Sequence, residues 1–474
     1  MPSPFDVPML IGGHWRHGGH ASDRHDPYRG DLVARVPSST ATDVDDALKA
    51  ACEARDSAAA VPARERAALL RRVAGLLREQ VHPIAQVMSR ETGKALADAI
   101  AEVARAPDTL EIAAEEAVRI KGEHVPMDAS PTGAGKLAIQ LRFPVGVIVA
   151  ITPFNAPINL ACHKLAPAIA AGNTVVLKPS PQSSWVTHRL IELFVQAGTP
   201  PGVLNVVHGH EAGALLVKDP RADFISFTGS SRVGAAIKAA SGLRRVALEL
   251  GGNCATIIDE DADIATAAAT CARNAMRLAG QSCVSVQNVY VHQAVAETFS
   301  NLALKEVASL RLGDPLDPQT EIGTLVDQNS ALRIESLIQD ALGEGAELLA
   351  GGKRNGAQLQ PTVLTRLNPT MSVVESEIFG PVLNILPVSS FAEAIRCVNA
   401  SRYGLQTGVY TRSLANAMQA ARSIRAGGII INGSSTWRSD QMPYGGVKDS
   451  GIGREGPEYA MREMTEERLI VFNL

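Results

Sequence analysis

Between residues 145 and 252 the sequence alternates short, continuous apolar runs with segments of helical spacing. The runs include VGVIVAI (145–151), TVVLK (174–178) and DFISFTG (223–229), and helical segments such as WVTHRLIELFVQAG (185–198) lie between them. Strands that are apolar on both faces belong to parallel sheets that helices cover on both sides. This part of the chain therefore predicts an α/β unit with a parallel sheet, ending near Glu249.

A second α/β stretch begins at CATIID (254–259) and continues to about residue 446, and helical spacing also fills residues 44–118. A chain of 474 residues is too long for one compact core, so two or three domains are expected. LAIQLRF (137–143) and the terminal ERLIVFNL (467–474) read as strands. A free strand edge is a docking surface, so these two segments could pair with another subunit.

Composition and charge exclude several classes of protein. The formal net charge is −4, with no run of like charges, which argues against a nucleic-acid partner and against a membrane-surface partner. The N-terminus lacks the pattern of a signal peptide, and no apolar run approaches the ~20 residues that span a bilayer. We therefore expect a cytoplasmic protein.

The six cysteines are scattered without a CxxC pair, which argues against a disulfide framework and against a structural zinc site, so no metal is expected.

Two segments suggest a site for a phosphate-bearing ligand. FTGSSRVG (227–234) follows a strand and opens a helix, and the free N–H groups of a helix start suit a pyrophosphate near Gly229 and Ser230. The segment is not GxGxxG, and ordinary helix capping explains it equally well. Lys178 ends an apolar strand, where a side chain either faces a ligand crevice or extends along the surface to water.

Three further residues have the chemistry of a catalytic centre. Asn155 follows a strand within ITPFNAP, and Glu249 ends a strand within ELGG. Cys283 lies in AGQSC, directly after a helix predicted over 265–280. A cysteine thiolate adds to an aldehyde, an amide and a backbone N–H can hold the oxyanion, and a carboxylate can activate water against a thioester.

Seven motifs in order carry a resemblance to the aldehyde dehydrogenase superfamily. They are ITPFNAP, KPS, FTGSSRVG, LELGGN, AGQSC, ESEIFGPV and MPYGGVKDSGIGRE. The resemblance spans about residues 10–474 and implies an α/β fold with a Rossmann-like cofactor domain, an α/β catalytic domain and a small β oligomerisation element. The implied boundaries are 1–122 and 145–249 for the NAD(P)-binding domain, 250–446 for the catalytic domain, 447–463 for a return to the cofactor domain, and 123–144 with 464–474 for the oligomerisation strands.

The resemblance also implies roles for individual residues. Cys283 is the expected nucleophile and Glu249 the general base of deacylation, while Asn155 and the Cys283 N–H form the oxyanion hole and Lys164 supports the site. The expected cofactor is NAD or NADP. The residues expected to bind it are Thr152, Phe154, Lys178, Ser180, Gly229, Ser230, Gly251, Glu377 and Phe379. Many NAD-preferring members of the family carry a glutamate where this chain has Pro181, so we expect NADP to be tolerated.

In the family, the residues that select the substrate lie six positions before the residue that matches Cys283 and just before the one that matches Met442. This chain has Arg277 and Arg438 there, with Trp437 adjacent and His163 on a pocket-lining helix. Two guanidinium groups favour an anionic aldehyde, because arginine binds carboxylate, phosphate or sulfonate in forked pairs. Alternatively, Arg277 faces solvent or pairs with an acidic residue across an interface.

The local motifs GQSCVSVQ and RSDQMPYGGVKDSGIGREG are most similar to the lactaldehyde, nonphosphorylating glyceraldehyde-phosphate and sulfoacetaldehyde dehydrogenase branches. They suggest a small-molecule aldehyde with a phosphate, sulfonate or carboxylate group, and a homodimer or homotetramer. Glu249 favours hydrolysis over transfer to coenzyme A. A coenzyme A-acylating enzyme and a catalytically silent structural protein on the same fold are the alternatives.

Overall fold

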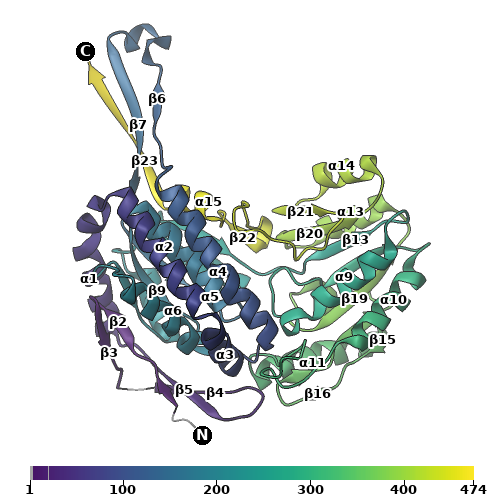
Figure 1. The fold of residues 1–474 in the computed structure, drawn as a ribbon. Coiled ribbons are helices and arrows are strands. Elements are labelled where there is room, and N and C mark those ends of the chain that lie inside the picture. The colour runs from purple at the N-terminus through teal and green to yellow at the C-terminus, as the bar shows by residue number, and fades with distance from the viewer. Residues whose placement is uncertain (1–3, 20) are drawn as a thin grey trace.

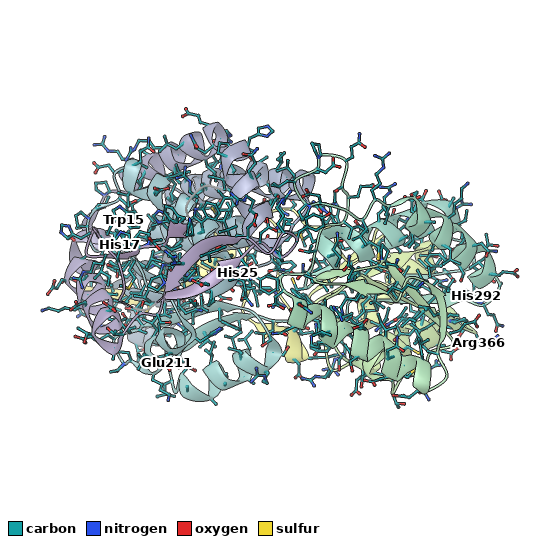
Figure 2. The ribbon with its side chains drawn as sticks, turned by 90° about the horizontal axis from the view of Figure 1, so that it is seen from below. Trp15, His17, His25, Glu211, His292 and Arg366 are labelled. Carbon is teal, nitrogen blue, oxygen red and sulfur yellow. The ribbon has the colours of Figure 1, made fainter. Side chains whose placement is uncertain are left out.

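The chain forms two α/β lobes that lie side by side, with a narrow sheet projecting from the first (Figure 1). The structure is a computed structural model that describes residues 4–19 and 21–474. Viewed from below, Trp15 and Glu211 lie on the first lobe, and His292 and Arg366 lie on the second (Figure 2).

The first lobe is built on an eight-stranded sheet. Its strands are β2 (Met9–Ile11), β3 (His14–Arg16), β8 (Val147–Ile151), β9 (Thr174–Lys178), β10 (Leu204–Val206), β11 (Phe224–Thr228), β12 (Arg245–Glu249) and β22 (Gly451–Ile452). Their order is β22-β12-β11-β8-β9-β10-β2-β3, and the five strands from β12 to β10 run parallel. Every residue of β8, β9 and β11 is buried, which confirms the predicted helix-covered parallel sheet.

The helices of this lobe cover both faces of the sheet. They are α1 (Ala41–Ala60), α2 (Ala63–Glu79), α3 (Val81–Thr92), α4 (Leu96–Ala117), α5 (Pro157–Ala171), α6 (Ser184–Gln196), α7 (His210–Lys218), α8 (Ser231–Ala240) and α15 (Pro457–Glu463). All fifteen residues of α5 are buried, because α5 packs beneath α2 and α4 against the sheet. A helix enclosed in this way holds its side chains in fixed positions behind the loops that it follows.

The second lobe repeats the architecture with a seven-stranded sheet. Its strands are β13 (Ala255–Ile258), β14 (Asn288–His292), β15 (Glu347–Ala350), β18 (Thr362–Thr365), β19 (Val382–Val388), β20 (Gln406–Tyr410) and β21 (Gly428–Ile431). The order is β15-β18-β19-β14-β13-β20-β21, with only β15 antiparallel to its neighbour. The helices are α9 (Ile264–Met276), α10 (Ala296–Ser309), α11 (Gln328–Gly343), α12 (Ser372–Glu375), α13 (Phe391–Ala400) and α14 (Leu414–Ser423). This lobe has its own apolar core.

The two segments predicted as docking strands pair with each other. β23 (Thr465–Asn473) runs antiparallel to β7 (Lys136–Pro144), and β6 (Glu123–Val125) completes a three-stranded sheet that projects from the first lobe (Figure 1). Leu469 and Phe472 are about half exposed on it. Exposed apolar side chains on a projecting sheet suit a subunit contact, but the assembly and the domain boundaries stay predictions.

The predicted helix over 265–280 ends earlier than expected. α9 stops at Met276, and a 3₁₀ turn over Arg277–Gly280 follows, with positive φ at Leu278 and Ala279. The carboxylate of Asp98 explains the break, because it accepts hydrogen bonds from the Arg277 side chain and from the Leu278 backbone N–H. Cys283 therefore follows an irregular turn and not a helix.

Two smaller sheets had no counterpart in the sequence prediction. They contain β1 (Phe5–Asp6), β4 (Ala21–His25) and β5 (Leu32–Pro37) at the N-terminus, and β16 (Arg354–Asn355) and β17 (Gln358–Leu359). Across residues 4–19 and 21–474, no helix combines the length and apolar character needed to cross a membrane.

Candidate active site

The carboxyl ends of four parallel strands meet at one edge of the first sheet. Ile151 of β8 lies opposite Lys178 of β9, and Thr228 of β11 lies opposite Glu249 of β12. Most of the residues expected to bind the cofactor lie at these four ends. They are Thr152, Phe154, Lys178, Ser180, Gly229, Ser230 and Gly251. The connection direction reverses between β8 and β11, and ligands of open α/β sheets bind at such a switch point.

The side chains at this edge fit a dinucleotide. Ser230 is the N-cap of α8, where free N–H groups and the helix dipole attract a phosphate. Thr152 is buried, and its hydroxyl has no partner among the described residues. Burial lowers the pKa of Lys178 to about 8, and no hydrogen bond joins its ammonium to the described residues. Such unpaired polar groups are available to the hydroxyls and phosphates of a bound nucleotide.

The second lobe contributes Glu377 and Phe379 to the same region. Glu377 accepts a hydrogen bond from the Gly252 N–H at 3.3 Å, and burial raises its pKa to about 7. A Cβ at Gly251 would lie 2.1 Å from Glu377 Oε2, so only glycine allows this approach. The ring of Phe379 meets that of Phe154 edge-on, with centroids 5.9 Å apart. The predicted cofactor residues of both lobes therefore lie around one region.

Cys283 lines a cavity of about 170 Å³ between the two lobes. Asn155, Arg277, Arg438 and Tyr444 are among the residues that share the cavity wall. Cys283 Sγ lies 3.1 Å from the Tyr444 hydroxyl. Burial raises the pKa of Cys283 to about 11, although the hydrogen bond to Tyr444 acts in the opposite direction. The thiol is thus at a cavity and among polar groups, unlike the fully buried Cys162 and Cys271.

Asn155 has its amide directed at the turn that carries Cys283. Its Nδ2 donates a hydrogen bond to the Gln281 carbonyl at 2.9 Å. The bond fixes the amide on the cavity wall that it shares with Cys283, and it leaves the second N–H of Nδ2 available to a ligand oxygen in the cavity.

Glu249 ends β12 and does not line the cavity, but its charge acts on the pKa of Cys283. It is 4% exposed, and neither carboxylate oxygen has a hydrogen-bond partner among the described residues. A Cβ at Gly445 would lie 2.7 Å from Glu249 Oε1, so the glycine leaves room beside the carboxylate. Burial first, and then the nearby charge of Glu455, raise the pKa of Glu249 well above its ordinary value. An unpaired buried carboxylate with a raised pKa has the properties of a general base.

Glu455 belongs to the same buried cluster, although the sequence prediction did not single it out. Lys164 Nζ and Arg438 Nη2 each lie 3.1 Å from one of its carboxylate oxygens. Burial alone would raise its pKa, but Lys164 and Arg438 hold it below the usual range. Lys164 therefore reaches the site through Glu455, which bears a full negative charge next to Glu249. The sequence motif that contains Tyr444 and Glu455 was recognised, but not the importance of these two residues within it. Their contacts with Lys164 and Cys283 join distant parts of the chain, so no signal in the sequence pointed to them.

The four residues expected to bind substrate occupy different positions. Arg277 and Arg438 line the cavity, and Arg277 Nε pairs with Asp98 at 2.7 Å. His163 is buried behind Arg438, and Trp437 is 58% exposed; neither belongs to the cavity wall. His163 acts on the cavity only through the residues that it contacts.

Comparisons with known proteins identify the family of the chain. The model of the aldehyde dehydrogenase family matches residues 15–470. The chain belongs to the aldehyde dehydrogenase family. It is 43% identical to a 3-sulfolactaldehyde dehydrogenase from Priestia aryabhattai, over 98% of both chains. Two similar solved structures are each 36% identical to the chain. The first is an NADP-dependent glyceraldehyde-3-phosphate dehydrogenase from Bacillus halodurans complexed with NADP, with a TM-score of 0.97 over 99% of this chain and 100% of that one. The second is an aldehyde dehydrogenase from Physcomitrella patens in complex with succinate, with a TM-score of 0.96 over 99% of both chains.

This aldehyde dehydrogenase has the fold that its motifs predicted, and it is an NAD(P)-dependent enzyme with NAD or NADP as cofactor. The roles of the individual site residues stay predictions, which the geometry above supports.

Proposed function

We propose that the enzyme oxidises a short anionic aldehyde to the carboxylic acid by covalent catalysis at Cys283. The observation that carries the proposal is one cavity wall that holds the Cys283 thiol, the Asn155 amide and the Arg438 guanidinium. Glu249, whose two carboxylate oxygens have no partner among the described residues, is near enough for its charge to act on the pKa of Cys283.

The chain's own residues perform the covalent steps. The Cys283 thiolate adds to the aldehyde carbonyl and forms a thiohemiacetal, while Asn155 Nδ2 and the Cys283 N–H donate to its oxyanion. NAD or NADP, held at the strand ends around Lys178 and Ser230 and by Glu377, would supply the hydride acceptor, so that loss of a hydride from the thiohemiacetal would leave a thioester on Cys283. Glu249 then takes a proton from water as the water attacks the thioester, and the acid leaves with the thiolate restored.

The charge of the cavity wall supports an anionic substrate. Its charged members are four cations, Lys94, Arg105, Arg277 and Arg438, and two anions, Asp98 and Glu102. Within the wall, Lys94 pairs with Glu102 and Arg277 pairs with Asp98. Arg105 and Arg438 pair with Asp440 and Glu455, two carboxylates that do not line the cavity.

Arg438 and Arg105 keep unused donors. Arg438 Nε is buried and has no hydrogen-bond partner among the described residues. Arg105 donates hydrogen bonds from Nε and Nη2 to Asp440, which, within the part of the chain that the structure describes, leaves its Nη1 free to donate to a ligand. Related enzymes are named for sulfolactaldehyde and for glyceraldehyde 3-phosphate, aldehydes that bear a sulfonate and a phosphate. Free guanidinium donors in the cavity would bind such groups.

Pro181 supports use of NADP as well as NAD. It begins a 3₁₀ turn just after β9, next to Ser180 at the cofactor edge of the sheet. A glutamate at this position would repel the 2′-phosphate of NADP, and the uncharged Pro181 does not. The 36% identical enzyme from B. halodurans is NADP-dependent and was solved in complex with NADP, which supports the proposal.

A substrate screen tests the function. Short aldehydes with and without a phosphate, sulfonate or carboxylate group are supplied with NAD or NADP, and acid formation is measured without coenzyme A. We expect acid from anionic aldehydes with both cofactors. Acid that forms only with coenzyme A would instead favour the acylating alternative, and an exclusive requirement for NAD would reject the interpretation of Pro181.

Replacing Arg438 with leucine tests the anion-binding role. We expect the KM for anionic aldehydes to rise roughly 10- to 100-fold more than the KM for neutral aldehydes, the effect of losing hydrogen bonds to a charged group. The ratio is decisive because the variant also removes a partner of Glu455, which affects both substrates alike. Arg412→Leu, on an exposed residue of the second lobe, is the matched control. An equal rise for both substrate classes would contradict the assignment.

A further inference from the structure

Tyr444 is the polar side chain that touches the reacting sulfur. Its hydroxyl lies 3.1 Å from Cys283 Sγ, within the range of a hydrogen bond to sulfur. The residue is only 4% exposed. It reaches the sulfur from a segment 161 residues further along the chain, so the contact depends on the folded site.

The backbone and a neighbouring cation hold the Tyr444 ring in place. The Tyr444 N–H donates to the Glu455 carbonyl at 3.0 Å, and the Tyr444 carbonyl accepts from the Glu455 N–H. The guanidinium of Arg438 lies over the ring, 3.8 Å from its centroid. The two backbone bonds fix the main chain of Tyr444, while burial of the ring and its cation–π contact with Arg438 restrain the side chain that carries the hydroxyl.

The chemistry of the pair sets the direction of the hydrogen bond. A thiolate has no proton and can only accept, so the Tyr444 hydroxyl donates whenever Cys283 is ionised. Burial, together with the charge of Cys283, raises the pKa of Tyr444 well above its ordinary value, which keeps its proton on the oxygen.

We propose that Tyr444 is a positioning residue for catalysis, which donates a hydrogen bond to the Cys283 thiolate and thereby stabilises and orients the nucleophile before the aldehyde arrives. The inference rests on the proposed role of Cys283. It assigns the activation of the sulfur to Tyr444 and leaves water activation to Glu249.

The other charged groups near the sulfur do not replace this donor. Glu249 and Glu377, when ionised, oppose a thiolate at Cys283 and raise its pKa. Arg438 favours the thiolate, but acts through space and from behind the Tyr444 ring. The hydroxyl of Tyr444 is thus the one hydrogen-bond donor to Cys283 Sγ that the described residues supply.

Alkylation of Cys283 tests the inference without any aldehyde. The rate of reaction with iodoacetamide is followed against pH by mass spectrometry of the Cys283 peptide, in the wild type and in Tyr444→Phe, which keeps the ring under Arg438. We expect the apparent pKa of Cys283 to rise by about one to two units and the rate at pH 8 to fall roughly 10- to 100-fold, the effect of one hydrogen bond to a charged group. The rates should converge at high pH. Tyr290→Phe, which removes the hydroxyl of another buried tyrosine, is the matched control and should keep the wild-type profile.

A second variant moves the pKa the other way. With 3-fluorotyrosine at position 444 the phenol is more acidic and donates a stronger hydrogen bond, so the apparent pKa of Cys283 should fall. This arm decides the question if Tyr444→Phe does not fold. A wild-type alkylation profile in each folded variant would overturn the inference. A shifted profile in an enzyme that oxidises no aldehyde would uphold the inference and reject the proposed function.

Discussion

Cys283→Ala is expected to lose aldehyde oxidation by roughly 10⁴-fold or more, because no other nucleophile replaces the sulfur in the covalent step. The neighbouring Cys254 does not substitute for it: Cys254 is buried, its thiol donates to the Cys283 carbonyl, and burial raises its pKa beyond the ordinary range. Initial rates of cofactor reduction with saturating aldehyde measure the effect.

The control is a cysteine away from the cavity. Cys397→Ala, in α13 of the second lobe, should keep wild-type rates. NADP binding by Cys283→Ala, followed by fluorescence, should be unchanged, which separates lost chemistry from lost folding. Residual turnover within tenfold of the wild type would contradict a covalent mechanism at Cys283.

The fold was predictable wherever local pattern decides structure. A strand buried on both faces is mostly apolar, so β8, β9 and β11 could be located to within a residue or two. The end of α9 was not predictable, since the carboxylate that breaks it, on Asp98, comes from a helix almost 180 residues earlier. Local pattern holds no information about such a partner.

The residues of the site also fall into a predictable group and an unpredictable group. Asn155, Glu249 and Cys283 could be proposed because each lies in a short motif with its own chemistry, and strand ends in a parallel sheet meet at one edge. Glu455 and Tyr444 acquire their importance from contacts with Lys164 and Cys283, which only the folded chain brings about. Long-range pairing of charges in a buried site cannot be read from residue spacing.

Glu249→Gln is expected to stop hydrolysis while the earlier covalent steps continue. Glutamine cannot accept a proton from water, so steady-state turnover should fall roughly 10²- to 10⁴-fold and the thioester should accumulate on Cys283. Rapid mixing should then show a burst of cofactor reduction close to one per site, and mass spectrometry should find the acyl group on the Cys283 peptide.

The pH profile gives this prediction a second readout. Because the pKa of Glu249 is raised, the wild-type carboxyl is protonated at low pH and becomes a base as pH rises, so hydrolysis should increase with pH. The glutamine variant should lose this dependence. Glutamine is also a neutral side chain of nearly the same size as the protonated carboxyl, so the Tm should change little. Glu344→Gln, at an exposed position after α11, is the control. Turnover close to that of the wild type, with no acyl group trapped on Cys283, would show that another group activates the water.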